Sequence, residues 1–256
     1  MVRPHPGYAA IMSGALDGVV AAVTGASSGI GEATARALAA QGATLALLAR
    51  RRDRLEDLAT ELGGATSVHE VDVSDGDATA RAIDEVAGHH GRLDVLVNNA
   101  GYGSMVPAAE SDLSEWRRMV DVNITGVLAT THAALPHLTR AADSTRGVAD
   151  VVTISSVAGR KVSGPAVNVY AATKHAVGAF SEALRQEFGA AHVRVGLVEP
   201  GLVRSELTEG NGAIDEVGEL GVMEAADIAD AVVWMVTRPR RVAVNEILVR
   251  PIEQTR

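Results

Sequence analysis

The chain of 256 residues contains no cysteine. This absence excludes disulfide bonds, catalysis by a thiolate and zinc sites with cysteine ligands. The sequence also has no apolar run near the ~20 residues that a membrane-spanning helix requires, so we expect no membrane partner. Because chains without disulfides suit a reducing compartment, we expect a cytoplasmic location.

Positive charge is scarce relative to negative charge. The chain has 23 Lys and Arg residues against 32 Asp and Glu residues, which gives a net charge of −9. Such a chain repels a phosphate backbone, and no basic stripe with interleaved aromatic residues offsets that charge, so we expect no nucleic-acid partner. The eight histidines lack the spacing of metal ligands, and we expect no metal site.

Length and composition predict one globular domain. Apolar residues make up 47% and charged residues 21% of the chain, and α/β folds of this length commonly have a single core. Residues 1–15 lack the apolar centre of a signal peptide and are expected to be a flexible extension, which leaves residues 16–256 as the domain. Met12 precedes the first strand pattern, so Met1 and Met12 are both candidates for the natural start.

Short aliphatic runs alternate with longer segments of helical period. This order predicts a doubly wound α/β (Rossmann) fold, with a seven-stranded parallel sheet and helices on both faces. The predicted strands are Val19–Thr24, Thr44–Ala49, Ser67–Val71, Val95–Asn98, Val148–Ile154, Val193–Val198 and Glu246–Val249. The predicted helices are Ile30–Gln41, Arg52–Leu62, Asp75–His90, Leu113–Thr139, Val169–Phe188 and Ala225–Val236. Since such sheets bind ligands beyond the carboxyl ends of their strands, the non-periodic residues 202–222 are the expected substrate lid.

A glycine cluster, Thr24-Gly25-Ala26-Ser27-Ser28-Gly29-Ile30-Gly31, follows the first predicted strand and opens the first predicted helix. Glycines let the backbone turn tightly and approach a pyrophosphate, which the N-terminus of a helix attracts. Turns also need glycine, but the position between a strand and a helix favours dinucleotide binding. The predicted cofactor-binding residues here are Gly25, Ser27, Ser28, Gly29, Ile30 and Gly31.

The second predicted strand ends in Ala49-Arg50-Arg51, where an NAD-binding chain would offer an acidic residue to the ribose 2′-hydroxyl. An arginine fork suits the dianionic 2′-phosphate of NADP. Arg50, with Arg51 beside it, therefore favours NADP(H) over NAD(H). The alternative is that these arginines begin a solvated helix face that extends to Arg54.

Two further strand ends carry residues suited to a dinucleotide. Asp72 can accept a hydrogen bond from the adenine amino group and Val73 can pack against the ring; alternatively Asp72 caps a helix, a role for which Ser74 and Asp75 are better placed. The fourth strand ends in Asn98-Asn99-Ala100-Gly101, whose small and amide side chains can lie beneath a ribose. This tetrapeptide is also an ordinary turn sequence.

The segment Tyr170-Ala171-Ala172-Thr173-Lys174 lies on a predicted helix, and its spacing places Tyr170 and Lys174 on one face. An ammonium group beside a phenol lowers the pKa of the phenol, so that Tyr170 can give or take a proton. Lys161 and Lys174 are the only two lysines among the 23 basic residues, and a compact ammonium suits this task better than a planar guanidinium. The alternative is an amphipathic helix with an exposed lysine.

Ser155 and Ser156 follow the fifth predicted strand at the same edge of the sheet. A hydroxyl at this place can hold a substrate oxygen while negative charge develops on it. We favour Ser156 as the catalytic serine, and Ser155 stays open as the alternative.

These segments, in this order, resemble the short-chain dehydrogenase/reductase family over Leu16–Arg250. The resemblance rests on the glycine motif, Asp72, Asn98-Asn99-Ala100-Gly101, Asn123, Ser156, Tyr170-(x3)-Lys174 and Pro200-Gly201. It implies that Ser156 polarises the substrate oxygen, that Tyr170 is the acid/base, and that Lys174 lowers the pKa of Tyr170 and binds the nicotinamide ribose. It further implies that Asn123 holds a water that links Lys174 to solvent. The residues implied to line the nicotinamide are Pro200, Gly201, Val203 and Ser205, the last standing where the family usually has threonine.

Within the family, Ala49-Arg50-Arg51, Ile154–Arg160 and Asn245–Pro251 resemble an NADP-dependent branch that contains clavulanic aldehyde reductase and 3-hydroxy acid dehydrogenases. The resemblance implies hydride transfer between NADP(H) and a carbonyl or alcohol carbon of a small molecule, by an aldehyde/ketone reductase or a hydroxy-acid dehydrogenase. It also implies a homotetramer or homodimer. The alternatives are a 3-oxoacyl carrier-protein reductase, which usually has a basic residue where Ser28 stands, and a non-catalytic NADP(H)-binding redox sensor.

The expected lid is rich in acidic residues. Its acidic residues are Glu206, Glu209, Asp215, Glu216 and Glu219, against the single basic residue Arg204. This charge is expected to disfavour an anionic substrate on the lid side.

Overall fold

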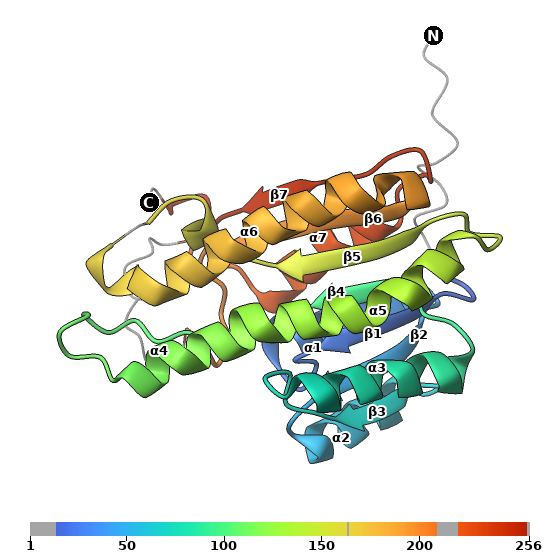
Figure 1. Ribbon diagram of the computed structural model, residues 1–256, viewed down its shortest axis with the longest axis horizontal. Helices are drawn as coiled ribbons and strands as arrows, with labels where there is room; N and C mark the ends of the chain where they lie inside the picture. The colour runs from blue at the N-terminus through green and yellow to red at the C-terminus, as the bar shows by residue number, and fades with distance from the viewer. Residues whose placement is uncertain (1–13, 163, 209–219, 255–256) are drawn as a thin grey trace, which may run out of the picture.

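The computed structural model describes residues 14–162, 164–208 and 220–254 (Figure 1). Its centre is a parallel sheet with the strand order β3-β2-β1-β4-β5-β6-β7. The strands are β1 (Val20–Thr24), β2 (Thr44–Ala49), β3 (Ser67–Glu70), β4 (Val95–Asn98), β5 (Ala149–Ile154), β6 (Val193–Pro200) and β7 (Glu246–Val249). The doubly wound fold and the seven predicted strands are confirmed. Most of the predicted N-terminal extension and residues 209–219 of the predicted lid lie outside the described residues.

Helices cover both faces of this sheet, as Figure 1 shows. They are α1 (Gly29–Ala40), α2 (Arg52–Leu62), α3 (Gly76–His90), α4 (Leu113–Val120), α5 (Gly126–Ala142), α6 (Asn168–Phe188) and α7 (Ala225–Val236). Ala21 and Val23 of β1 pack with α1 and α7 in one core, whereas Val20 and Ala22 pack with α3 and α5 in the other. Burial on both faces explains why the strands are continuous apolar runs. None of the described helices is both long and apolar enough to cross a membrane.

The segment predicted as one helix, Leu113–Thr139, contains an irregularity that the prediction missed. Between α4 and α5 the chain forms a five-residue π-helical turn, Asp121–Thr125. A π turn adds one residue to the helical repeat and so rotates the following side chains relative to an ideal helix. Asn123 lies within this turn and is 2% exposed. The turn therefore places a polar side chain against the interior of the sheet edge.

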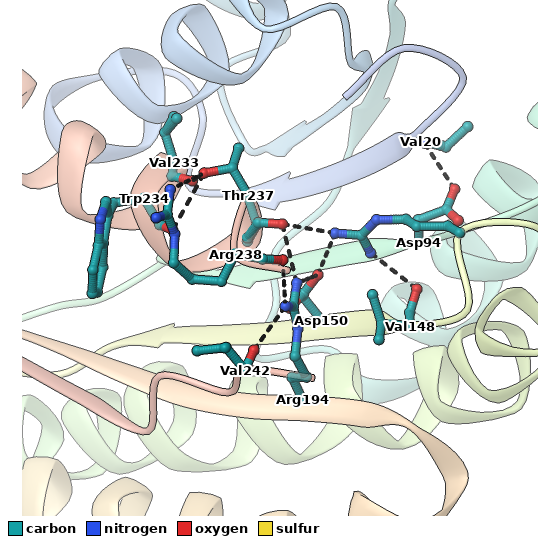
Figure 2. Close-up of polar contacts among 12 residues, drawn as sticks. Val20, Asp94, Val148, Asp150, Arg194, Val233, Trp234, Thr237, Arg238 and Val242 are labelled. Atoms are coloured by element: carbon teal, nitrogen blue, oxygen red, sulfur yellow. Dashed lines mark hydrogen bonds and ion pairs between the residues drawn. The ribbon is translucent and has the colours of Figure 1, made fainter. Parts of the chain in front are cut away.

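Buried ion pairs hold the amino ends of the central strands, at the edge of the sheet opposite the strand ends that carry the predicted site (Figure 2). Asp94 accepts a hydrogen bond from the Val20 backbone N at 2.9 Å. Asp150 is 3% exposed and accepts from Arg194 Nε at 2.7 Å and from Arg146 at 2.6 Å. Because removing one partner of such a pair costs about 3–5 kcal/mol, these contacts hold β4, β5 and β6 in place and leave the carboxyl edge free for function.

Candidate active site

The carboxyl ends of the strands open into a cleft of about 1030 Å³. The strand order reverses between β1 and β4, and open α/β sheets bind ligands at such a switch point. Of the residues predicted for the site, all line this cleft except Gly31 and Asn123. Parts of the chain as distant as the glycine motif, the Tyr170 helix and Pro200-Gly201 are thus brought together.

Glycine is required at three positions of the motif for two different reasons. Gly25 and Gly29 have φ values of +65° and +56°, in the left-handed region that favours glycine. Gly31 instead permits a close approach, since a Cβ there would lie 2.3 Å from Gly25 O and 2.4 Å from Asn99 Nδ2. Gly31 therefore allows the helix to pack closely against Gly25 and Asn99, and it does not line the cleft.

The Asn98-Asn99-Ala100-Gly101 segment braces the switch point. Thr24 Oγ1, at the end of β1, accepts hydrogen bonds from the backbone N of Asn99 and of Ala100, each at 3.0 Å. Asn99 Nδ2 donates in turn to Thr24 O at 2.9 Å. These bonds tie the ends of β1 and β4 together and set the shape of the cleft floor.

The two arginines after β2 point to different places. Arg51 donates from Nε to Ser27 Oγ at 3.1 Å and from a terminal nitrogen to Ser28 Oγ at 2.7 Å. The Arg50 side chain is 62% exposed and lies 3.7 Å from Asp72 Oδ2. Both residues line the cleft, but the guanidinium that reaches the glycine motif belongs to Arg51 and not to Arg50, which the sequence analysis had put first.

Asp72 lines the cleft beside Arg50, and its predicted contact with an adenine stays a prediction. Burial alone would raise the pKa of Asp72, but hydrogen bonds from Ser74 and the charge of Arg50 together lower it. The ionised carboxylate already accepts two hydrogen bonds from Ser74 at Oδ1. The alternative role as a helix cap is wrong, because Asp75 caps α3 by accepting from Ala78 N at 2.9 Å.

Tyr170 and Lys174 lie on the buried face of α6. Tyr170 is 8% and Lys174 7% exposed, so the alternative of a solvated lysine is wrong. The Lys174 ammonium lies 5.6 Å from the centroid of the Tyr170 ring and donates to Ile154 O at 2.9 Å. This bond anchors α6 to the end of β5, the strand that leads to Ser156.

The two serines after β5 differ in their contacts. Ser155 is 4% exposed, and its hydroxyl donates to Lys174 O at 3.4 Å. The Ser156 hydroxyl accepts from Ala158 N at 3.1 Å, and it lies close enough to the Tyr170 phenol to lower the pKa of that phenol. The geometry therefore favours Ser156 as the residue that binds a substrate oxygen together with Tyr170. The Ser155 hydroxyl instead holds the backbone of the Tyr170 helix.

The pKa values of this pair differ from the sequence-based expectation. Burial raises the pKa of Tyr170, and the hydrogen bond with Ser156 offsets only part of that rise. Burial also lowers the pKa of Lys174 to about 8. The expected lowering of the Tyr170 pKa by Lys174 is therefore not what this structure shows, because the ammonium is directed to the Ile154 carbonyl. A phenol that keeps its proton near neutral pH is able to donate it to a carbonyl oxygen.

Asn123 sits behind Lys174 rather than on the cleft surface. Its amide pairs with both backbone polar groups of Tyr102, each at 2.8 Å, and donates to Thr173 Oγ1 at 3.0 Å. A Cβ on Gly101 would lie 3.6 Å from Asn123 Oδ1 and 3.9 Å from Lys174 Nζ. Asn123 Oδ1 and Lys174 Nζ therefore both lie close to Gly101, while the water that Asn123 is expected to hold stays a prediction.

Several cleft residues were missed by the sequence analysis. Tyr102, Met105 and Val167 pack around Tyr170, and Glu253 and Gln254 form a wall beside Pro200-Gly201. The last two follow the carboxyl end of β7, a position that by itself indicates the functional edge of such a sheet. Among the residues described, no group of three or more His, Asp or Glu side chains is arranged to hold a metal ion.

The predicted lid is described only to Thr208 and from Leu220 onward. Glu206 faces the glycine motif, where Arg51 and Ser28 bind it. Arg204 pairs with Glu224 at 3.1 Å. The other acidic residues of the lid, Glu209 to Glu219, lie outside the described residues.

Comparisons with known proteins agree with this geometry. The family model described as short chain dehydrogenase matches residues 19–214. Serine 3-dehydrogenase of Agrobacterium fabrum is 37% identical over 242 residues, which cover 91% of this chain and 94% of that protein. A closed form of serine dehydrogenase complexed with NADP+ has a TM-score of 0.85 at 31% identity, covering 93% and 97% of the two chains. A 3-ketoacyl-(acyl-carrier-protein) reductase from Brucella melitensis, complexed with NADH, has a TM-score of 0.83 at 28% identity, covering 92% and 98%.

Proposed function

This chain belongs to the short-chain dehydrogenase family and is an oxidoreductase that acts on CH–OH groups, and we propose that it transfers a hydride between NADP(H) and a carbonyl or alcohol carbon of a small molecule. The observation that carries the proposal is the buried Tyr170 phenol, which lines the cleft together with Ser156 while the Lys174 ammonium lies 5.6 Å from the centroid of the Tyr170 ring. A non-catalytic redox sensor would not need Tyr170 and Lys174 side by side at the cleft together with Ser156, so this alternative is disfavoured.

The residues of the cleft fit a dinucleotide. The left-handed Gly25 and Gly29 leave no side chain between the backbone and a pyrophosphate, and the volume of about 1030 Å³ exceeds that of most small-ligand pockets. Asp72 and Val73 would hold the adenine. The residues that would hold the nicotinamide and its ribose are Asn99, Ala100, Gly101, Lys174, Pro200, Gly201, Val203 and Ser205. When bound, the cofactor supplies or accepts the hydride.

The catalytic residues would act on the substrate oxygen. In the direction of reduction, the Tyr170 O–H donates its proton to that oxygen as negative charge develops there. The Ser156 hydroxyl donates a second hydrogen bond to the same oxygen and stabilises the charge. Lys174, with a pKa of about 8, carries its charge at neutral pH and lies 5.6 Å from the centroid of the Tyr170 ring, where its ammonium would bind the nicotinamide ribose. In the direction of oxidation, the same groups move the proton the opposite way.

Preference for NADP(H) is part of the proposal. Arg51 with Ser27 and Ser28 forms a cluster of donors beside the glycine motif, and guanidinium and hydroxyl donors suit a phosphate dianion. Arg50, further out beside Asp72, adds positive charge to the same region. The NADP+ bound to the serine dehydrogenase relative supports this preference.

Two substrate classes suit the site. An aldehyde, ketone or 3-hydroxy acid is the first, and the resemblance to serine 3-dehydrogenase supports it because serine is itself a 3-hydroxy acid. A 3-oxoacyl thioester is the second, supported by the resemblance to the Brucella reductase. Assembly as a homodimer or homotetramer and a cytoplasmic location stay predictions, which gel filtration and cell fractionation test.

Absorbance of NADPH at saturating cofactor tests the function directly, with aldehydes, ketones, serine, other 3-hydroxy acids and a 3-oxoacyl thioester as substrates. We expect turnover of at least one class, and loss of about 10²–10⁴-fold in kcat for Tyr170→Phe. Tyr102→Phe is the matched control, since Tyr102 also lines the cleft but its hydroxyl bonds to Glu115. A Tyr170→Phe enzyme as active as the Tyr102→Phe enzyme would refute the role given to Tyr170.

A further inference from the structure

The lid brings a carboxylate of its own to the arginines beside the glycine motif. Glu206 accepts hydrogen bonds from Arg51 at 2.9 and 3.1 Å, one to each carboxylate oxygen. Arg54 donates to the same carboxylate at 2.6 Å and Ser28 Oγ at 3.2 Å. Glu206 is about 150 residues from these partners along the chain, so tertiary folding alone creates the contact.

Two of these donors, Arg51 and Ser28, are groups that we assign to the 2′-phosphate of NADP(H). Arg51 and Ser28 both line the cleft, and Arg51 also holds Ser27. A carboxylate and a phosphate are both compact anions with paired oxygens, and guanidinium and hydroxyl donors bind both of them. Hydrogen bonds, first that from Arg54, lower the pKa of Glu206 although burial opposes them, so the group is an anion at neutral pH.

We propose that Glu206 is an internal ligand of the 2′-phosphate subsite, which NADP(H) must displace in order to bind there. This inference rests on the proposed function. The 2′-hydroxyl of NADH does not need the ion pair with Arg51 and so leaves Glu206 in place. Glu206 therefore weakens the binding of NADP(H) selectively and narrows the preference for it over NAD(H).

The turn that carries Glu206 also reaches the substrate side of the cleft. Residues 203–208 form a compact turn, in which Thr208 Oγ1 donates to Val203 O at 2.7 Å and accepts from Ser205 N at 3.0 Å. Leu207, the next residue after Glu206, lines the cleft, and both it and the Tyr170 ring approach Gly103. One turn therefore carries both Glu206 at the phosphate subsite and Leu207 in the wall that faces Tyr170.

Binding measurements with Glu206→Gln test the inference. The ligands are NADPH, NADH, adenosine 2′,5′-bisphosphate and AMP, each titrated by calorimetry into the full chain. Glu206→Gln keeps the shape of the side chain but removes its charge, and we expect tighter binding of NADPH and of the bisphosphate by about fivefold, the effect of releasing two surface ion pairs. Binding of NADH and AMP is expected to stay unchanged.

Glu56→Gln is the matched control. Glu56 pairs with Arg52 at 2.7 Å on the neighbouring α2 and does not line the cleft, so this variant makes the same change in net charge without touching the subsite. We expect its affinities to equal those of the wild type. The inference is overturned if Glu206→Gln binds NADPH no more tightly, or gains equally for NADH. If the wild type binds neither NADPH nor the bisphosphate, the proposed NADP(H) function itself fails.

Discussion

Replacement of Lys174 by methionine is expected to stabilise the fold while it abolishes activity. Lys174 is 7% exposed, and burial lowers its pKa from 10.5 to about 8. That difference corresponds to roughly 3 kcal/mol of destabilisation at neutral pH. Methionine has a similar length and no charge to bury, but it loses the bond to Ile154 O, worth about 1 kcal/mol. The expected net gain is about 2 kcal/mol in the free energy of unfolding at pH 7.

The pH dependence of this gain follows from the direction of the shift. Between about pH 8 and pH 10.5 the unfolded chain keeps the proton of Lys174 and the folded chain has released it. The wild type therefore gains stability as the pH rises through this range, keeps that gain above pH 10.5 and loses it as the pH falls through 8. The advantage of the variant is expected to narrow by about 1 kcal/mol from pH 7 to pH 9.

Urea unfolding at pH 7 and pH 9 measures both effects, with turnover of NADPH measured in parallel. Lys161→Met is the matched control, because Lys161 is the other lysine of the chain and is exposed. We expect it to change neither stability nor activity, whereas Lys174→Met lowers kcat at least about 100-fold. The reasoning is refuted if Lys174→Met is less stable than the wild type at pH 7, or if the gap between them is the same at both pH values.

Two further substitutions test the geometry of the site. Ser156→Ala is expected to lower kcat by about 10²–10³-fold, as for loss of a donor to a developing oxyanion, and Ser155→Ala much less; steady-state kinetics with the reverse order would contradict the assignment. Gly31→Ala places a Cβ 2.3 Å from Gly25 O, so we expect a loss of about 1–3 kcal/mol in unfolding free energy and weaker NADPH binding by calorimetry. Gly88→Ala, in α3 with open space around it, serves as control and is expected to be neutral or stabilising; equal behaviour of the two variants would disprove the packing argument.

The fold and the functional edge of the sheet were determined by the sequence alone. Strands that are buried on both faces have continuous apolar sequences, and the helices between them have apolar residues at helical spacing. The order of strands and helices can therefore be predicted without knowledge of tertiary contacts. The glycine motif and the pair of Tyr170 and Lys174 could also be identified from the sequence, because their chemistry depends on spacings of a few residues. Asp72 and Ser156 could be predicted to lie near the same site, because the carboxyl ends of parallel strands lie at one edge of the sheet.

Only the tertiary structure decided which neighbours each side chain has. Adjacent residues at a strand end point in different directions, so Arg51 rather than Arg50 reaches the glycine motif. In the same way, the Ser155 hydroxyl bonds to Lys174 O, whereas the Ser156 hydroxyl lowers the pKa of Tyr170. The pKa of Tyr170 depends on how deeply several distant segments bury it, and local spacing predicted the opposite direction. Glu206 reaches Arg51 across about 150 residues, and long-range contacts of this kind leave no periodic or local pattern in the sequence.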